Sequence, residues 1–165
     1  MIEMKSKPVY LYTDGSSLGN PGPGGYGLRL EWAEMSYVKE FSQGFVRTTN
    51  NRMELLAVIV GLELLKKQPL EVVVFSDSKY VIDSVDKKWV FGWEKKAFKD
   101  KKNSDLWKRF LKIYRKHNVN FQWIKGHANI PGNELADQLA VEASQKAILQ
   151  IDKGYESGES EQALF

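Results

Sequence analysis

Four acidic residues of this sequence fall where predicted strands end or inside predicted helices. Asp14 and Asp77 each follow an apolar segment, VYLYT and LEVVVFS. Glu54 and Asp137 lie in two predicted helices. Ligands bind beyond the carboxyl ends of parallel strands in open α/β sheets, so these side chains are expected to meet there. Clustered carboxylates repel one another and need a cation to neutralise them. Oxygen ligands favour Mg²⁺ or Mn²⁺ over zinc, and two such ions about 3.5–4 Å apart would support a phosphoryl displacement.

Each of these carboxylates also has a purely structural interpretation. Asp14 and the glycine after it are typical of a turn that ends the strand. Glu54 is three residues after Asn51, the spacing of a capping box. Asp77 is placed to cap the helix that begins after it, and Asp137 to lie on a solvated helix face. The metal hypothesis therefore depends on all four side chains being brought together.

The elements that would position these residues follow from apolar periodicity. Paired strands are expected first, then strands that alternate with helices, which predicts one mixed α/β sheet with helices on its faces. The strands are predicted over 8–15, 26–32, 36–45, 70–77 and 119–125, and the helices over 52–67, 78–85, 104–116 and 134–148. The long helix that Asn50 and Asn51 open is apolar almost all round, so deep burial is expected. We predict one domain over residues 1–147 and a disordered acidic tail over 148–165.

Composition and charge exclude several classes of protein. The 165 residues have 42% hydrophobic and 27% charged side chains, as a globular domain does. No cysteine is present, which excludes disulfides, thiolate zinc sites and a cysteine nucleophile. No apolar run is long enough to span a membrane, and the first residues have no apolar signal region, so no membrane association and a cytoplasmic location are expected.

The net charge of +3 conceals a strongly basic segment. Residues 86–116 contain 12 Lys or Arg and 4 Asp or Glu, a local charge of +8. A segment of this kind is typical of a surface that binds a polyanion. A solvated helical face is the structural alternative.

Four motifs, in order and in register, make the sequence similar to the type 1 ribonuclease H family. They are YTDGSSLGNPGPGGYG at 12–27, TTNNRMEL at 48–55, SDSKYV at 76–81 and GHANIPGNELADQLA at 126–140. The resemblance runs from about residue 8 to residue 143 and is to bacterial-type members that carry a basic protrusion. It implies a ribonuclease H-like fold, with a five-stranded mixed sheet flanked by helices. It also implies a metal-dependent endonuclease that cuts the RNA strand of an RNA–DNA hybrid.

The resemblance assigns roles to residues that match the family motifs. It implies that the four carboxylates hold two Mg²⁺ ions, which Mn²⁺ may replace, with Asp14 bridging both. His127 matches a histidine that assists proton transfer and product release, a role that suits a near-neutral pKa. The implied contacts to the substrate's minor groove, 2′-hydroxyls and phosphates are Asn20, Thr49, Asn50 and Asn51. Turn and cap roles are the alternatives for these four.

The basic segment matches the family's basic protrusion, here called the handle and defined as residues 87–102. Its aromatic and lysine side chains are suited to cradling a deoxyribose–phosphate strand. Trp93, Lys95, Lys96 and Lys99 are the implied substrate contacts, whereas Trp89 and Trp107 are expected to pack against helices. One departure from the family is Lys79, which replaces a glutamine found in some relatives at a base-contacting position. A lysine favours phosphate over a base edge.

Three functions remain open at this point. The leading hypothesis is hydrolysis of RNA in hybrids by water and two metal ions, which leaves 5′-phosphate and 3′-hydroxyl ends. The alternatives are a related nuclease that acts on DNA, such as a junction resolvase or exonuclease, and a hybrid-binding domain without catalysis. We expect a monomer. The tail could also dock to a replication protein, but no motif in the sequence supports this partner.

Overall fold

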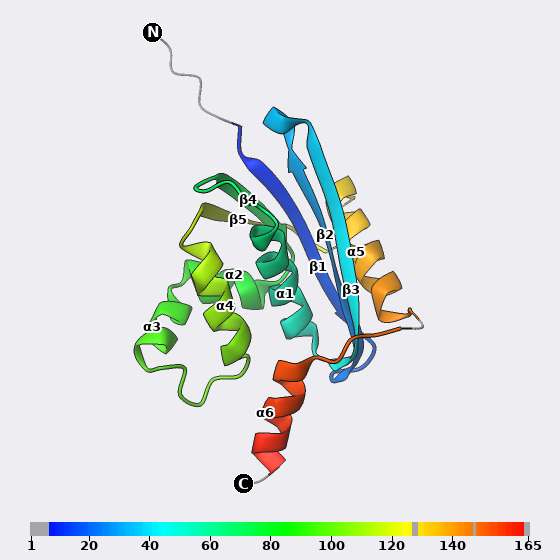
Figure 1. Ribbon diagram of the computed structural model, residues 1–165, viewed down its shortest axis with the longest axis vertical. Coiled ribbons are helices and arrows are strands. Elements are labelled where there is room, and N and C mark those ends of the chain that lie inside the picture. Colours follow the sequence, from blue (N-terminus) through cyan, green and yellow to red (C-terminus); the bar gives the residue numbers. More distant parts are fainter. Residues whose placement is uncertain (1–6, 127–128, 147, 164–165) are drawn as a thin grey trace.

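The fold is built around a five-stranded sheet in the order β3-β2-β1-β4-β5 (Figure 1). The computed structural model describes residues 7–126, 129–146 and 148–163. Neighbouring strands are antiparallel among β1, β2 and β3, whereas β4 runs parallel to β1 and β5 parallel to β4. The mixed sheet predicted from the order of elements is therefore confirmed. The strands are β1 Val9–Ser17, β2 Gly22–Trp32, β3 Tyr37–Thr48, β4 Glu71–Ser76 and β5 Asn118–Trp123.

Helices cover the two faces of the sheet unequally. Figure 1 shows α1 and α5 on opposite faces, with α5 over β1, β2 and β3. On the α1 side, α4 packs against α1, and α2 and α3 lie further out. The bounds are α1 Asn50–Glu63, α2 Lys79–Asp86, α3 Trp89–Lys95, α4 Ser104–Tyr114, α5 Pro131–Ser144 and α6 Lys153–Ala163, and a short 3-10 helix covers Ala33–Met35. Within the described ranges, none of the helices has the length and apolarity needed to cross a membrane.

The long apolar helix is buried as expected. Helix α1 lies between the sheet and α4, and ten of its fourteen residues are buried, from Arg52 to Leu62. Its apolar side chains belong to one core cluster with strand residues such as Leu11 and Val74 and with Trp107 of α4. A helix enclosed in this way can be apolar on all sides, which explains why its sequence has no polar face.

A glycine allows α5 to approach the sheet next to Asp14. Gly27 pairs with Asp14 across β1 and β2. A Cβ atom at Gly27 would lie 2.3 Å from the carbonyl oxygen of Ala136 in α5, which is far too close for any side chain. Because position 27 is glycine, the α5 backbone rests directly on β2 and carries Asp137, the residue after Ala136, toward β1.

The sequence predicts a turn at Asp14, but the first strand continues through this residue. β1 continues to Ser17 because β2 supplies an antiparallel partner for each residue, from the pair Asp14 and Gly27 to the pair Ser17 and Gly24. The parallel ladder with β4 ends earlier, at Tyr12. Asp14 therefore lies beyond the parallel pairing but inside a continuous strand.

The chain end also differs from the expected disordered tail. Residues 148–152 form a strap that crosses the edge of the sheet, and α6 follows it. The backbone of Gln150 hydrogen-bonds to Gly44 and Val46 of β3, with N···O distances of 2.9 and 2.8 Å. Asp152 is buried and accepts hydrogen bonds from Arg52 and from the Thr48 hydroxyl. The acidic residues that suggested disorder lie mostly after this strap, whereas its own sequence, ILQID, is largely apolar.

Candidate active site

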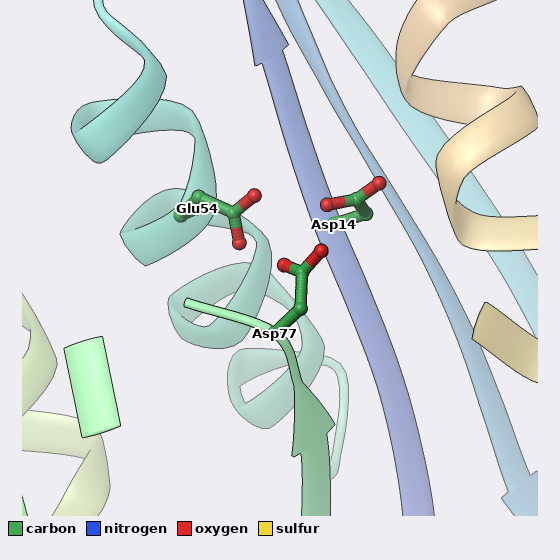
Figure 2. Close-up of side chains that lie close together, drawn as sticks. All are labelled: Asp14, Glu54 and Asp77. Atoms are coloured by element: carbon green, nitrogen blue, oxygen red, sulfur yellow. The ribbon is translucent and has the colours of Figure 1, made fainter. Parts of the chain in front are cut away.

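Three carboxylates converge at the carboxyl end of β1 and β4. The parallel ladder of β1 and β4 ends with Tyr12 opposite Phe75, and Asp14 and Asp77 each lie two residues further along. Glu54 reaches the same point from α1, which packs on β1 (Figure 2). One ligand oxygen from each of the three residues lies within 4.8 Å of the others. The convergence expected from the strand ends is thus present.

Neither Glu54 nor Asp77 serves as a helix cap. Thr49 is the N-cap of α1, and its hydroxyl accepts a hydrogen bond from the Arg52 amide at 3.3 Å. Ser78 is the N-cap of α2, and its hydroxyl accepts from the Val81 amide at 3.2 Å. The capping-box interpretation of Asn51 and Glu54 is therefore wrong, as is the capping role considered for Asp77.

The Glu54 carboxylate is held against β1 instead. One of its oxygens accepts a hydrogen bond from the Gly15 amide at 3.0 Å. Gly15 has no room for a side chain, because a Cβ atom there would lie 2.3 Å from the Glu54 amide nitrogen. The other Glu54 oxygen is buried and has no hydrogen-bond partner among the described residues. A buried carboxylate oxygen without a donor needs either a proton or a cation.

Burial and mutual repulsion raise the pKa of two of these carboxyl groups. Burial is the largest cause of the rise in the pKa of Asp14 to about 7, and the nearby carboxylates of Asp137 and Asp77 add to it, while Glu54 opposes it. Burial also raises the pKa of Glu54 well above its usual range, and the negative charge of Asp14 contributes. Both shifts mean that the ionised forms of these carboxyl groups are disfavoured unless a positive charge lies nearby. The donor set therefore fits a divalent cation bound by oxygen ligands.

Asp137 completes the acidic set from the opposite face of the sheet. It comes from α5 and lies close enough to Asp14 to raise the pKa of that group. Two adjoining hollows at this edge of the sheet are both lined by Asp14, Asp77 and Asp137. The alternative of a carboxylate confined to a solvated helix face does not hold for Asp137.

The asparagine and threonine residues singled out in the sequence lie beside the carboxylates. Asn50 and Asn51 are exposed and line one hollow together with Asp14, Glu54 and Asp77. The Asn20 side chain accepts a hydrogen bond from the Asn50 amide at 3.1 Å, which places the loop before β2 next to the start of α1. Thr49 is adjacent and half-buried as the cap of α1.

His127 lies outside the described residues. The residues on each side of it are informative, however, because Gly126 and Ile130 line the second hollow with Asp14 and Asp137. That hollow also contains Lys125 and Glu134, which the motifs alone did not single out.

The handle is firmly attached to the rest of the domain but lies away from the carboxylates. Glu94 of α3 forms a two-pronged ion pair with Arg115 just after α4, with N···O distances of 2.6 and 2.8 Å. Figure 1 shows α3 and the loop that follows it at the outer edge of the molecule. Lys95, Lys96 and Lys99 are all exposed there, and none of them lines either hollow.

Two tryptophans of the handle and Trp107 of α4 differ widely in burial. Trp107 is fully buried, so its predicted packing role is confirmed. Trp89 is 47% exposed, with the Lys87 ammonium 5.3 Å from its ring centre, so it is buried far less than Trp107, for which the same packing against helices is expected. Trp93 is half-buried and meets Trp107 edge-on at 5.8 Å between ring centres. Helical periodicity alone does not distinguish these three positions.

Sequence reasoning did not identify Trp123 and left Lys79 aside. Trp123 ends β5 and donates a hydrogen bond from its indole nitrogen to the Asp77 carbonyl oxygen at 3.3 Å. Lys79 lines the same hollow as the asparagines and lies over the Trp123 ring. The only sequence signal was the unusual lysine in the SDSKYV motif.

Fold and acidic site together are those of a nuclease of the ribonuclease H type. The family model of RNase H matches residues 6–145. The chain is 47% identical to Ribonuclease H of Shewanella sp. strain ANA-3, over 94% of this chain and 98% of that protein, and 48% identical to Ribonuclease H of Desulforamulus reducens, over 88% and 93%. The chain belongs to the RNase H family.

Solved structures agree with this assignment. LC9-RNase H1, a type 1 RNase H with the type 2 active-site motif, superposes with a TM-score of 0.75 at 32% identity, covering 87% of this chain and 74% of that one. LC11-RNase H1, solved in complex with an RNA/DNA hybrid, has a TM-score of 0.63 at 26% identity, covering 84% and 98%. The expected ribonuclease H-like fold is confirmed, and so is the expectation that the chain is a ribonuclease H hydrolase.

Proposed function

We propose that this chain is an endonuclease that hydrolyses the RNA strand of RNA–DNA hybrids and leaves 5′-phosphate and 3′-hydroxyl ends. The observation that carries the proposal is the hollow in which three convergent carboxylates adjoin the exposed amides of Asn50 and Asn51. Carboxylates suit the chemistry of phosphodiester cleavage, and amides both donate to and accept from 2′-hydroxyl groups. A solved relative, LC11-RNase H1, binds an RNA/DNA hybrid.

Two divalent cations are proposed as cofactors, with Mg²⁺ as the ordinary ion and Mn²⁺ as a substitute. Asp14, Glu54, Asp77 and Asp137 would hold them. Such ions, when bound, supply the positive charge that stabilises the attacking and leaving oxygens of an in-line displacement by water. The unpartnered Glu54 oxygen and the raised pKa of Asp14 support this assignment because both indicate missing positive charge.

The remaining residues would bind the substrate and move protons. Asn20, Asn50 and Asn51 would contact the minor groove and the 2′-hydroxyls. Thr49 would contact a phosphate. His127 would assist proton transfer and product release, a role supported by the position of its neighbour Gly126 at the hollow. Trp93 and the exposed handle lysines Lys95, Lys96 and Lys99 would contact the DNA strand.

Substrate choice tests the proposed function directly. With Mg²⁺, the chain should cleave an RNA–DNA hybrid efficiently and leave RNA–RNA and DNA–DNA duplexes of the same sequence intact. Asn51→Ala should impair hybrid cleavage without unfolding the chain, because Asn51 is exposed. Comparable cutting of the DNA duplex would instead favour a nuclease for DNA, and hybrid binding without any cutting would favour an inactive binding domain.

The handle should affect binding more than the chemical step. Changing Lys95, Lys96 and Lys99 together to Ala is expected to raise KM while leaving kcat nearly unchanged, because these side chains lie away from the carboxylates. The dependence of log affinity on log salt should become shallower by roughly 0.9 for each phosphate contact that is lost. A salt titration of hybrid binding in Ca²⁺ measures this slope. The control changes Lys66 and Lys67 to Ala. Both lysines are exposed and lie just beyond the carboxyl end of α1, away from the asparagines.

We also propose that the enzyme acts as a monomer in the cytoplasm. The lack of cysteine suits a reducing compartment. Light scattering coupled to size exclusion tests the oligomeric state.

A further inference from the structure

A lysine and a tryptophan meet at the rim of the carboxylate hollow. The Lys79 ammonium lies 4.0 Å from the centre of the Trp123 ring. The other five cation–aromatic contacts among the described residues range from 5.1 to 5.9 Å, and none of them involves a residue that lines this hollow. We propose that Lys79 binds a backbone phosphate of the RNA strand next to the bond that is cut, and that Trp123 is the residue that positions it. This inference rests on the proposed function.

Trp123 is fixed to the segment that carries Asp77. Its backbone pairs with Ser76 at the end of β4, and its indole nitrogen donates to the carbonyl oxygen of Asp77 at 3.3 Å. The ring is nevertheless 42% exposed, because it stands at the edge of the sheet rather than in the core. A rigid aromatic surface is therefore held beside the acidic site, and Lys79 lies against it.

Lys79 begins α2 immediately after the cap Ser78, so its backbone is also fixed two residues from Asp77. The side chain is exposed and makes no hydrogen bond or ion pair with another described residue. It does not pair with a carboxylate although it shares the hollow with several of them. The ring contact holds the ammonium in place while leaving its donors available for an incoming anion.

Phosphate is the ligand that best fits this lysine. An ammonium is a compact point charge that binds phosphate oxygens but cannot match the paired edge of a base as an amide can. Lys79 lines the same hollow as Asn50 and Asn51, which are proposed to contact the sugar edge of the substrate. A phosphate of the strand that enters this hollow would therefore pass within reach of Lys79. Holding the side chain on Trp123 beforehand lowers the entropy lost when that phosphate binds.

The test compares Lys79→Gln, Lys79→Arg and the control Lys66→Gln. Lys66 is also exposed, but it lies beyond the opposite end of α1 from the asparagines. Lys79→Gln should raise KM for a hybrid by roughly three- to tenfold with little change in kcat, and its salt slope for hybrid binding in Ca²⁺ should be shallower by about 0.9. The defect should accordingly shrink about threefold between about 50 and about 200 mM salt. Lys79→Arg should restore most of the binding.

Trp123 is tested through its dependence on Lys79. Trp123→Leu should weaken binding in the parent, whereas it should add almost nothing in the Lys79→Gln background, because the ring acts through the lysine. Trp123→Phe keeps an aromatic face and should be the milder change. A purely structural tryptophan would weaken both backgrounds equally, and that outcome would remove Trp123 from the proposal.

The result separates this inference from the function on which it rests. A parent that neither binds nor cuts hybrid overturns both. A parent that cuts hybrid, together with a Lys79→Gln variant whose salt slope equals that of Lys66→Gln, overturns the role of Lys79 alone, because the slope reports phosphate contacts whereas a glutamine could keep KM low through a base edge.

Discussion

Asp14→Asn is expected to lower the rate of hybrid cleavage about a thousandfold while making the metal-free fold more stable. Asp14 stands between Glu54, Asp77 and Asp137, and asparagine keeps its size but removes the charge that each proposed ion needs. A loss of roughly 4 kcal/mol in transition-state stabilisation corresponds to this change in rate. Single-turnover cleavage in saturating Mg²⁺ measures it.

The gain in stability follows from the sign of the pKa shift. The pKa of Asp14 is about 7 in the folded chain, against a usual value of 3.8. The folded state therefore holds a proton that the unfolded state releases, and the metal-free parent should lose stability as the pH rises from about 4 through 7. Asp14→Asn lacks this group, so its advantage over the parent should appear in EDTA near pH 8 and shrink near pH 4.

Urea unfolding at both pH values, in EDTA, measures the difference in stability. Glu71→Gln is a matched control, since Glu71 is an exposed carboxylate at the start of β4, the opposite end of the strand that precedes Asp77. It should change neither cleavage nor the pH dependence. A near-parental rate for Asp14→Asn would refute the metal assignment. A variant less stable than the parent near pH 8 would show that Asp14 is a structural residue.

The acidic cluster was predictable because it depends on strand direction. Once the first and fourth strands are parallel neighbours, residues that follow their ends must lie at one edge of the sheet. The sequence alone did not predict the cap of α1. Thr49, Asn50 and Asn51 are all plausible cap residues, and the choice depends on where packing against β1 lets the first turn begin.

Contacts between distant segments account for what the sequence could not predict. β1 continues beyond Asp14 because β2 pairs with it, and a turn-like Asp-Gly pair gives no sign of that partner. Trp89 and Trp107 look equivalent in a helical pattern, yet only Trp107 faces the core. The strap at 148–152 appeared disordered because its main contact, between Asp152 and Arg52, joins residues 100 positions apart.

Arg52 is the residue whose loss should cost the fold most. Its side chain is 4% exposed and donates to Asp152 through Nε and Nη2, at 2.8 and 2.9 Å, and to Asp105 through Nη1 and Nη2, both at 2.8 Å. One guanidinium thus connects the start of α1, the start of α4 and the strap before α6. Asp105 is half-exposed, whereas the Asp152 side chain is 8% exposed, so Asp152 depends on this cation far more.

Arg52→Met is therefore expected to lower the free energy of unfolding by about 3–5 kcal/mol, the usual cost of leaving a buried charge without its partner. Denaturant unfolding followed by circular dichroism measures this loss. The double variant Arg52→Met with Asp152→Asn should be more stable than Arg52→Met alone, because asparagine removes the uncompensated charge. Its oxygen can still accept from the Tyr155 amide, and its NH2 group can donate to the Thr48 hydroxyl oxygen. Asp105→Asn should cost much less than Arg52→Met, since water reaches that carboxylate. Equal stability of the single and double Arg52 variants would show that the strap is attached by packing rather than by this ion pair.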